Sequence, residues 1–99
     1  MLSIKKKQDG TALTVELEGR LDTTTAPELD DELFTVIGDV TDLTFDMTKL
    51  EYISSAGLRS LLSAHKKVSA NGTMKIANAS DEVKEIFDIT GFSQVFNII

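Results

Sequence analysis

The sequence predicts a small α/β domain built on one mixed β-sheet. Two strand-like segments flank a turn signal near the start, strand and helix patterns then alternate, and three segments carry the apolar stripe of an amphipathic helix. Strands joined through helices pair in parallel, whereas an opening hairpin is antiparallel, so the sheet should be mixed. The 99 residues suffice for a single domain, 1–99, with one hydrophobic core.

The first two predicted strands form a hairpin. Residues 2–7 make a short first strand, which the turn signal at residues 8–10 ends. Leu13, Val15 and Leu17 then alternate with polar residues, which is the period of a half-buried strand. We expect the loop between the two strands to be slightly longer than a two-residue turn.

The first predicted helix follows this hairpin. Thr25 and Glu28 have the spacing of a capping box, and Pro27 is tolerated in the first turn. We expect Phe34 to widen the apolar stripe of this helix and Gly38 to end it. The stripe itself comprises residues four positions apart: Leu29, Leu33 and Ile37.

The remaining elements continue the alternation. They are a strand over 42–47, a helix over 55–70, a strand over 73–77 and a helix capped by Ser80. Gly91 should end that last helix, and residues 95–99 are either an edge strand or a packed tail. This order predicts four or five strands with three main helices packed largely on one face of the sheet.

Composition narrows the classes of partner. The formal net charge of −6 argues against nucleic acid, which proteins bind through clustered Lys and Arg, and favours a protein partner with a basic surface. The N-terminus lacks the apolar core of a signal peptide, and no apolar run approaches the roughly 20 residues needed to cross a bilayer. We therefore expect a cytoplasmic domain that binds neither nucleic acid nor membrane.

Catalytic chemistry finds no support in the sequence. His65 lies ten residues after Ser55 on the same predicted helix, about 15 Å along its axis, too far for a nucleophile–base pair. There is no Gly-x-Ser-x-Gly, no P-loop and no cysteine, so we expect neither an enzyme nor a metal or other cofactor. We expect His65 to be a hydrogen-bonded structural residue at the edge of the buried stripe.

Asp46, at the end of a predicted strand, invites comparison with the phosphoacceptor of response-regulator receivers. The opening hairpin and the lack of an acidic pair argue against that interpretation. We expect Asp46 instead to brace the following loop through backbone N–H groups. Together with Asp22 and the Ser54–Ser55 turn, it is a candidate for the carboxyl edge of the sheet, where functional residues gather in such folds.

The serine pair lies in a strand-to-helix turn. Free N–H groups and the helix dipole at such a position favour negative charge. A serine there is either a helix cap or a hydroxyl that a kinase phosphorylates. Ser54 and Ser55 alone do not decide between these two roles.

A family resemblance bears on that choice. Residues 50–59, Leu-Glu-Tyr-Ile-Ser-Ser-Ala-Gly-Leu-Arg, resemble the signature of STAS domains and, more narrowly, of bacterial anti-sigma-factor antagonists. Residues 19–22 followed by threonines, and the closing residues 89–96, are similar to two further motifs of the family. The resemblance covers nearly the whole chain and implies a STAS-like fold.

The resemblance also implies a partner-switching function, and we expect the protein to be a monomer. In this family the unphosphorylated antagonist binds a GHKL-type serine kinase that doubles as an anti-sigma factor, thereby freeing the sigma factor. Phosphorylation ends that binding, and a PP2C-type phosphatase resets it. Aligning Gly57 and Leu58 with the family motif places Ser55 at the phosphorylated serine. The implied partner-binding residues are Asp22, Thr23, Thr24, Ser54, Ser55, Ala56, Gly57, Leu58 and Arg59.

Two departures from the motif leave an alternative open. Ser54 stands at the family's aspartate, a carboxylate that could orient or activate the serine, and Ala56 replaces a second hydroxyl residue. A STAS domain that works as a scaffold or ligand sensor without phosphorylation is therefore the second hypothesis. In either case Ser54 should support the turn.

Overall fold

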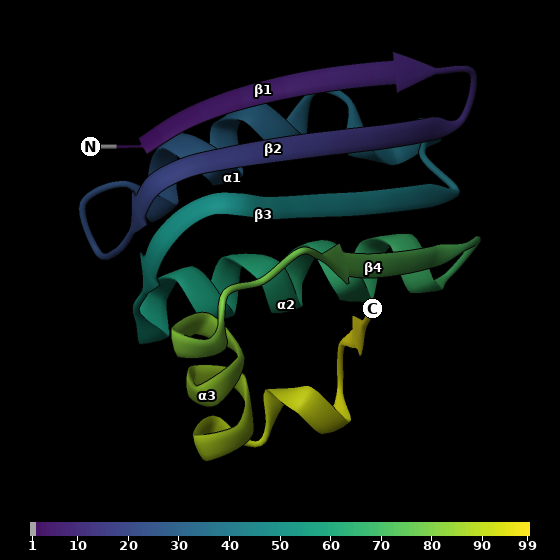
Figure 1. The fold of residues 1–99 in the computed structure, drawn as a ribbon. Helices are drawn as coiled ribbons and strands as arrows, with labels where there is room; N and C mark the ends of the chain where they lie inside the picture. The colour runs from purple at the N-terminus through teal and green to yellow at the C-terminus, as the bar shows by residue number, and fades with distance from the viewer. Residues whose placement is uncertain (1) are drawn as a thin grey trace.

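The computed structural model describes residues 2–99, which form a five-stranded sheet and three α-helices (Figure 1). The strand order is β1-β2-β3-β4-β5; β1 is antiparallel to β2 and every later pair is parallel, so the mixed sheet is confirmed. The elements are β1 (Leu2–Asp9), β2 (Ala12–Leu21), α1 (Ala26–Phe34), the 3₁₀ turn η1 (Ile37–Asp39), β3 (Asp42–Ile53), α2 (Ser55–Ser69), β4 (Thr73–Ala77), α3 (Asp81–Thr90), the 3₁₀ turn η2 (Phe92–Gln94) and β5 (Asn97–Ile98).

Helices α1 and α2 lie on one side of the sheet. In Figure 1, α1 and α2 run behind the strands, and α3 lies beyond the β4 side of the sheet, where it packs against β3 and η2. Alternate side chains of β2 and β3 are buried under the helices, and the residues between them are polar and partly exposed on the other face. One contiguous hydrophobic cluster thus fills the space between sheet and helices.

Aromatic rings close the core at the C-terminus. The Phe96 ring stacks on Phe92 at 5.2 Å between centroids and meets Phe87 edge-on at 5.7 Å. His65 also meets Phe96 edge-on, at 5.9 Å. Its Nδ1 is buried without a hydrogen-bond partner in residues 2–99, so His65 packs as an aromatic ring and the predicted hydrogen bond is absent.

The first helix differs from its prediction at both ends. The Thr25 hydroxyl does not cap it, because that hydroxyl donates to the Arg20 carbonyl oxygen at 2.8 Å and accepts from the Asp22 N–H at 2.8 Å. The helix ends at Phe34, so Gly38 does not end it. Ile37 is buried, but it belongs to the following turn η1 and not to α1. Phe34 is 76% exposed and lies outside the core that it was expected to widen.

Some strand boundaries differ from the predicted ones, because the neighbouring strand decides how far pairing extends. The β1–β2 connection is a two-residue turn with Asp9 opposite Ala12, tighter than expected because Gly10 adopts φ +62°. β3 continues past residue 47 to Ile53 because β2 supplies a parallel partner beyond the end of β4. The range of β4, the Ser80 cap of α3 and the left-handed Gly91 that ends α3 are confirmed, and the final segment includes the short edge strand β5.

Candidate functional site

Two loops meet where β2 and β3 end. Leu21 is the register partner of Ile53, and the Ser54 N–H donates to the Leu21 carbonyl oxygen at 2.8 Å. The β2–α1 loop and the start of α2 therefore lie side by side at the carboxyl edge of the sheet. We call residues 22–25 and 54–59 together the serine edge.

The two serines have different surroundings at the start of α2. Ser54 is the N-cap, with extended backbone angles of φ −98° and ψ 176°, and its hydroxyl oxygen accepts from the Gly57 N–H at 3.4 Å. Ser55 is the first helical residue, is exposed, and makes no side-chain hydrogen bond within residues 2–99. The cap is therefore Ser54 and not Ser55, and the supporting role of Ser54 in the turn is confirmed.

The start of α2 is also electrostatically distinct. The first turn of α1 contains Glu28 and that of α3 contains Asp81 and Glu82, but the first turn of α2 contains no acid. Arg59 follows Ser55 by one turn, is exposed, and forms no salt bridge in the described part of the chain. The positive end of the α2 dipole next to Ser55 is thus reinforced by a cation, a setting that favours an added negative group.

Gly57 permits the close approach of α2 to the sheet. A Cβ atom at this position would lie 2.7 Å from Leu21 Cγ and 2.9 Å from Ile53 Cγ1, closer than side chains tolerate. Leu58, the next residue, is only 3% exposed. Both residues are buried and hold the helix in place, so the structure gives them a packing role, and their contact with a partner stays a prediction.

Asp22 organises the other half of the serine edge. Its Oδ1 accepts from the backbone N–H groups of Thr24 and Thr25 at 3.0 and 3.1 Å, and lies 3.2 Å from the Thr25 hydroxyl oxygen. These bonds, that from the Thr25 N–H most of all, hold the pKa of Asp22 below its usual value. The loop is thereby fixed with Thr23 and Thr24 exposed. Asp22 thus mainly braces the backbone of the loop that exposes Thr23 and Thr24.

Asp46 does not belong to the serine edge. It pairs with Glu16 inside β3, seven residues before Ile53 and so about 23 Å from the strand's end. Its Oδ1 accepts from the Thr48 hydroxyl at 2.6 Å and the Thr48 N–H at 3.1 Å, and from the Asn78 side chain at 3.2 Å. The Thr48 hydroxyl is the main cause of its lowered pKa. Asp46 accepts from a backbone N–H as predicted, but it braces Thr48 within β3 and not a following loop, and its predicted position at the strand end and shared edge is wrong.

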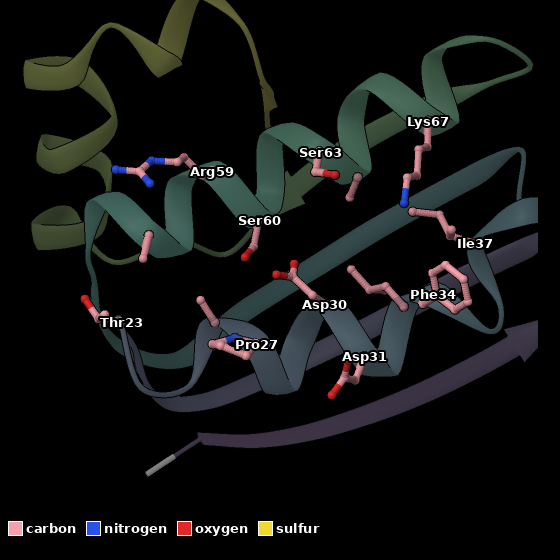
Figure 2. A pocket seen from close by; sticks show the side chains of 14 residues that line it. Thr23, Pro27, Asp30, Asp31, Phe34, Ile37, Arg59, Ser60, Ser63 and Lys67 are labelled. Atoms are coloured by element: carbon pink, nitrogen blue, oxygen red, sulfur yellow. The ribbon is translucent and has the colours of Figure 1, made fainter.

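A groove of about 510 Å³ continues from the serine edge between α1 and α2 (Figure 2). Thr23, Ala56 and Arg59 line the end nearest Ser55, and Phe34 and Lys67 line the far end. Sequence reasoning missed this groove because it assigned Phe34 to the core. The available signal was the recurrence of small residues along one face of α2: Ala56, Ser60, Ser63 and Ala64.

Other kinds of site have little basis in the described chain. Among residues 2–99 no cluster of three or more His, Asp or Glu side chains is placed to hold a metal ion. None of the helices in this range is long and apolar enough to cross a bilayer. The serine edge and the adjoining groove are the candidate functional surface.

The fold and this surface define a class: a small α/β domain with an exposed serine at a helix start on the carboxyl edge of its sheet. The STAS domain family model matches residues 3–99, and the chain belongs to the STAS domain family. The "Anti-sigma-B factor antagonist" of Bacillus subtilis is a relative, 28% identical over 98 residues, which cover 98% of this chain and 90% of that protein.

Solved structures agree on the fold. An anti-sigma factor antagonist from Mycobacterium paratuberculosis superposes with a TM-score of 0.87 at 20% identity, covering 99% of this chain and 85% of that one. The unphosphorylated form of the anti-sigma factor antagonist SpoIIAA superposes with a TM-score of 0.77 at 18% identity, covering 98% and 87%. The phosphorylated form of Bacillus SpoIIAA gives 0.76 at 19% identity, covering 98% and 91%.

Proposed function

We propose that this protein is an anti-sigma factor antagonist of a partner-switching pathway in the bacterial cytoplasm. In its unphosphorylated form it binds a GHKL-type serine kinase that also acts as the anti-sigma factor, and so releases the sigma factor. Phosphorylation of Ser55 ends the binding, and a PP2C-type phosphatase restores it. The protein is a regulator and catalyses no reaction. The observation that carries this proposal is the exposed Ser55 hydroxyl at the first position of α2, which makes no hydrogen bond to any other residue in the range 2–99.

The relatives support the proposal by their names. The Bacillus subtilis relative is an antagonist of an anti-sigma factor, and SpoIIAA, which shares the fold, exists in a phosphorylated form. A STAS fold therefore accommodates a phosphate group in at least one protein. The acid-free start of α2 and the neighbouring Arg59 give this chain a comparable capacity.

The switch follows from the physics of the modification. A phosphate adds about −1.5 to −2 charges, which the N-terminus of α2 tolerates, so the domain keeps its fold. The partner, in contrast, meets bulk and charge where it had packed against a small neutral hydroxyl. Each 1.4 kcal/mol lost at that contact weakens binding about tenfold, so a few kcal/mol suffice to release the partner.

The first prediction tests this assignment with matched serine variants. In the presence of ATP and candidate GHKL kinases, intact mass should show one added phosphate on the wild type and on Ser54→Ala, but none on Ser55→Ala. Ser55→Ala should still bind the kinase, because a methyl group keeps the surface small and neutral. Ser55→Asp should bind poorly, although one charge only partly mimics phosphate. Phosphopeptide mapping that places the phosphate on Ser54 would contradict the assignment.

A second candidate function rests on one observation. The Ser54 hydroxyl, at the position of the family's aspartate, caps α2, so the residue before Ser55 supplies no carboxylate to orient it. A scaffold or ligand-sensing STAS domain needs no such group. Two results together would support this second function: Ser55→Ala binds the partner with the affinity of the wild type, and no cognate kinase phosphorylates the wild-type chain.

A further inference from the structure

The groove between α1 and α2 has opposite charges on its two sides. Asp30 and Asp31 line it from α1, and the Asp30 carboxylate points toward α2 in Figure 2. Arg59 and Lys67 line it from α2, two turns apart. A segment lying in this groove would therefore meet the Asp30 carboxylate along one flank and the Lys67 ammonium group along the other, whereas the Asp31 and Arg59 side chains point away from the groove in Figure 2. That arrangement favours one orientation of a charged partner.

The groove also offers an apolar anchor beside a shallow floor. Phe34 is 76% exposed at the far end, with its ring centroid 5.8 Å from the Lys67 Nζ. The floor is made of small side chains, Ala26, Ala56, Ser60 and Ala64, which leave room for larger side chains from a partner. An exposed aromatic ring next to a hollow of small residues is typical of helix-in-groove recognition.

The groove is continuous with the serine edge. Thr23, Ala56 and Arg59 belong to both surfaces. Phe34 and Lys67 extend the same surface away from Ser55, since Lys67 lies twelve residues further along α2, or about 18 Å. A protein seated on the serine edge thus has the groove directly within its reach.

We propose that the groove receives an amphipathic helix of the same kinase that binds the serine edge, an inference that rests on the proposed function. The apolar face of that helix packs on Phe34 and the small residues of α2. Its basic flank faces Asp30, and its acidic flank faces Lys67. Since α1 spans nine residues, about 14 Å, roughly two to three turns of the incoming helix fill the groove.

This second contact lies apart from the phosphorylation switch. Phosphate on Ser55 alters the serine edge and leaves the far end of the groove unchanged. The groove therefore adds affinity and partner selectivity, whereas Ser55 controls release. Changes at the far end of the groove and changes at Ser55 should act on kinase affinity independently.

The second prediction tests the groove by calorimetric titration of the cognate kinase with unphosphorylated protein. Phe34→Ala should weaken binding about tenfold or more, as expected for an aromatic anchor. Ile89→Ala, which removes an equally exposed apolar side chain (77%) from α3, is the matched control and should bind like the wild type. Thermal melting should show all variants folded, because these side chains lie outside the core.

Two further pairs of variants separate shape from charge. Ser63→Phe fills the groove and should weaken binding, whereas Ser69→Phe, on the same helix outside it, should not. Lys67→Glu reverses one flank and should weaken binding more than Lys66→Glu, whose side chain lies outside the groove.

The outcomes distinguish this inference from the proposed function. If Ser55→Asp loses the kinase while Phe34→Ala, Ser63→Phe and Lys67→Glu all bind like the wild type, the groove proposal is overturned and the proposed function stands. If the wild type binds no GHKL kinase, both are overturned. Self-association that Phe34→Ala abolishes would identify a second copy of this chain as the occupant and would likewise overturn the proposal.

Discussion

Ser54 and Ser55 are adjacent residues of the same type, yet the backbone gives them opposite surroundings. The Ser54 hydroxyl is held against the Gly57 N–H, while the Ser55 hydroxyl faces solvent. The position of a serine relative to the first helical turn thus decides whether its hydroxyl is available for chemistry. The family alignment and the helix geometry both favour Ser55 over Ser54 as the proposed phosphorylation site, for different reasons.

At the same scale, the two carboxylates with lowered pKa values predict how stability depends on pH. Hydrogen bonds to the ionised Asp22 and Asp46 hold the pKa of each below the ordinary value of 3.8. Both groups therefore contribute stability that is present above pH 3.8 and lost as pH falls through the lower pKa of the folded state. We expect the melting temperature to fall below about pH 4.

The measurement for this third prediction compares variants along a pH series. Asp46→Asn should lower the melting temperature at pH 7 and flatten its decline in acid, because it removes one of the two groups responsible. Asp22→Asn should do the same and also loosen Thr23 and Thr24, so it should weaken kinase binding, whereas Asp46→Asn should not. A decline in acid as steep in both variants as in the wild type would contradict this account.

At the scale of elements, the close packing of α2 on the strand ends predicts the effect of a single methyl group. Gly57→Ala places a Cβ against Leu21 and Ile53 and should destabilise the fold by about 1–3 kcal/mol through overpacking. It should also displace the start of α2 and so weaken kinase binding beyond the loss of folded protein. Urea denaturation measures the loss of stability. Titration with the kinase, under conditions in which the variant is fully folded, measures the loss of binding.

Gly38→Ala is the control for this fourth prediction. A Cβ at Gly38 would meet nothing within 4 Å, and this glycine has no positive φ. The substitution should leave the free energy of unfolding unchanged or raise it by about 0.4–1 kcal/mol, because alanine reduces the conformational entropy of the unfolded chain. Equal stability of Gly57→Ala and Gly38→Ala would refute the role assigned to the close contact.

At the scale of the whole molecule, the single core predicts an unequal cost for neighbouring leucines. Leu61 is completely buried, whereas Leu62 is only partly buried against the core. Leu61→Ala should cost about 2–5 kcal/mol from lost transfer energy and the cavity left behind. Leu62→Ala should cost clearly less. Chemical denaturation of the two variants side by side measures the difference, and equal costs would contradict the assigned burial.

Local patterns predicted much of this fold. The Ser80 cap, the Gly91 stop and the range of β4 follow from neighbouring residues alone, and the structure confirms them. Thr25 differs because its hydroxyl is taken by the Arg20 carbonyl across a turn, a contact that capping rules do not contain. β3 reaches Ile53 because β2 extends beside it, and Phe34 is exposed because α1 ends there.

The candidate site was predicted in the same uneven way. The motif around Ser55 predicted that the Asp22 loop and the serine turn share one edge of the sheet, and the structure brings them together there, because strand-to-helix turns of parallel sheets gather at that edge. Asp46 was misplaced because its strand continues for seven more residues. The groove depends on the relative placement of two helices, which no single segment encodes. Gly57 and Leu58 carry the motif without reaching the surface, since they shape the turn from below.

The register of β2 and β3 also has a consequence for biosynthesis. Leu21 and Ile53 are distant in sequence, yet their pairing places the Asp22 loop beside the start of α2. A nascent or partly folded chain does not hold the two halves of the serine edge together, because the pairing of β2 with β3 closes a long loop, and this entropic cost is offset only when the whole sheet assembles. If the proposed kinase binds the serine edge, we expect it to recognise only folded molecules, so that chains still on the ribosome or unfolded by heat do not compete for it.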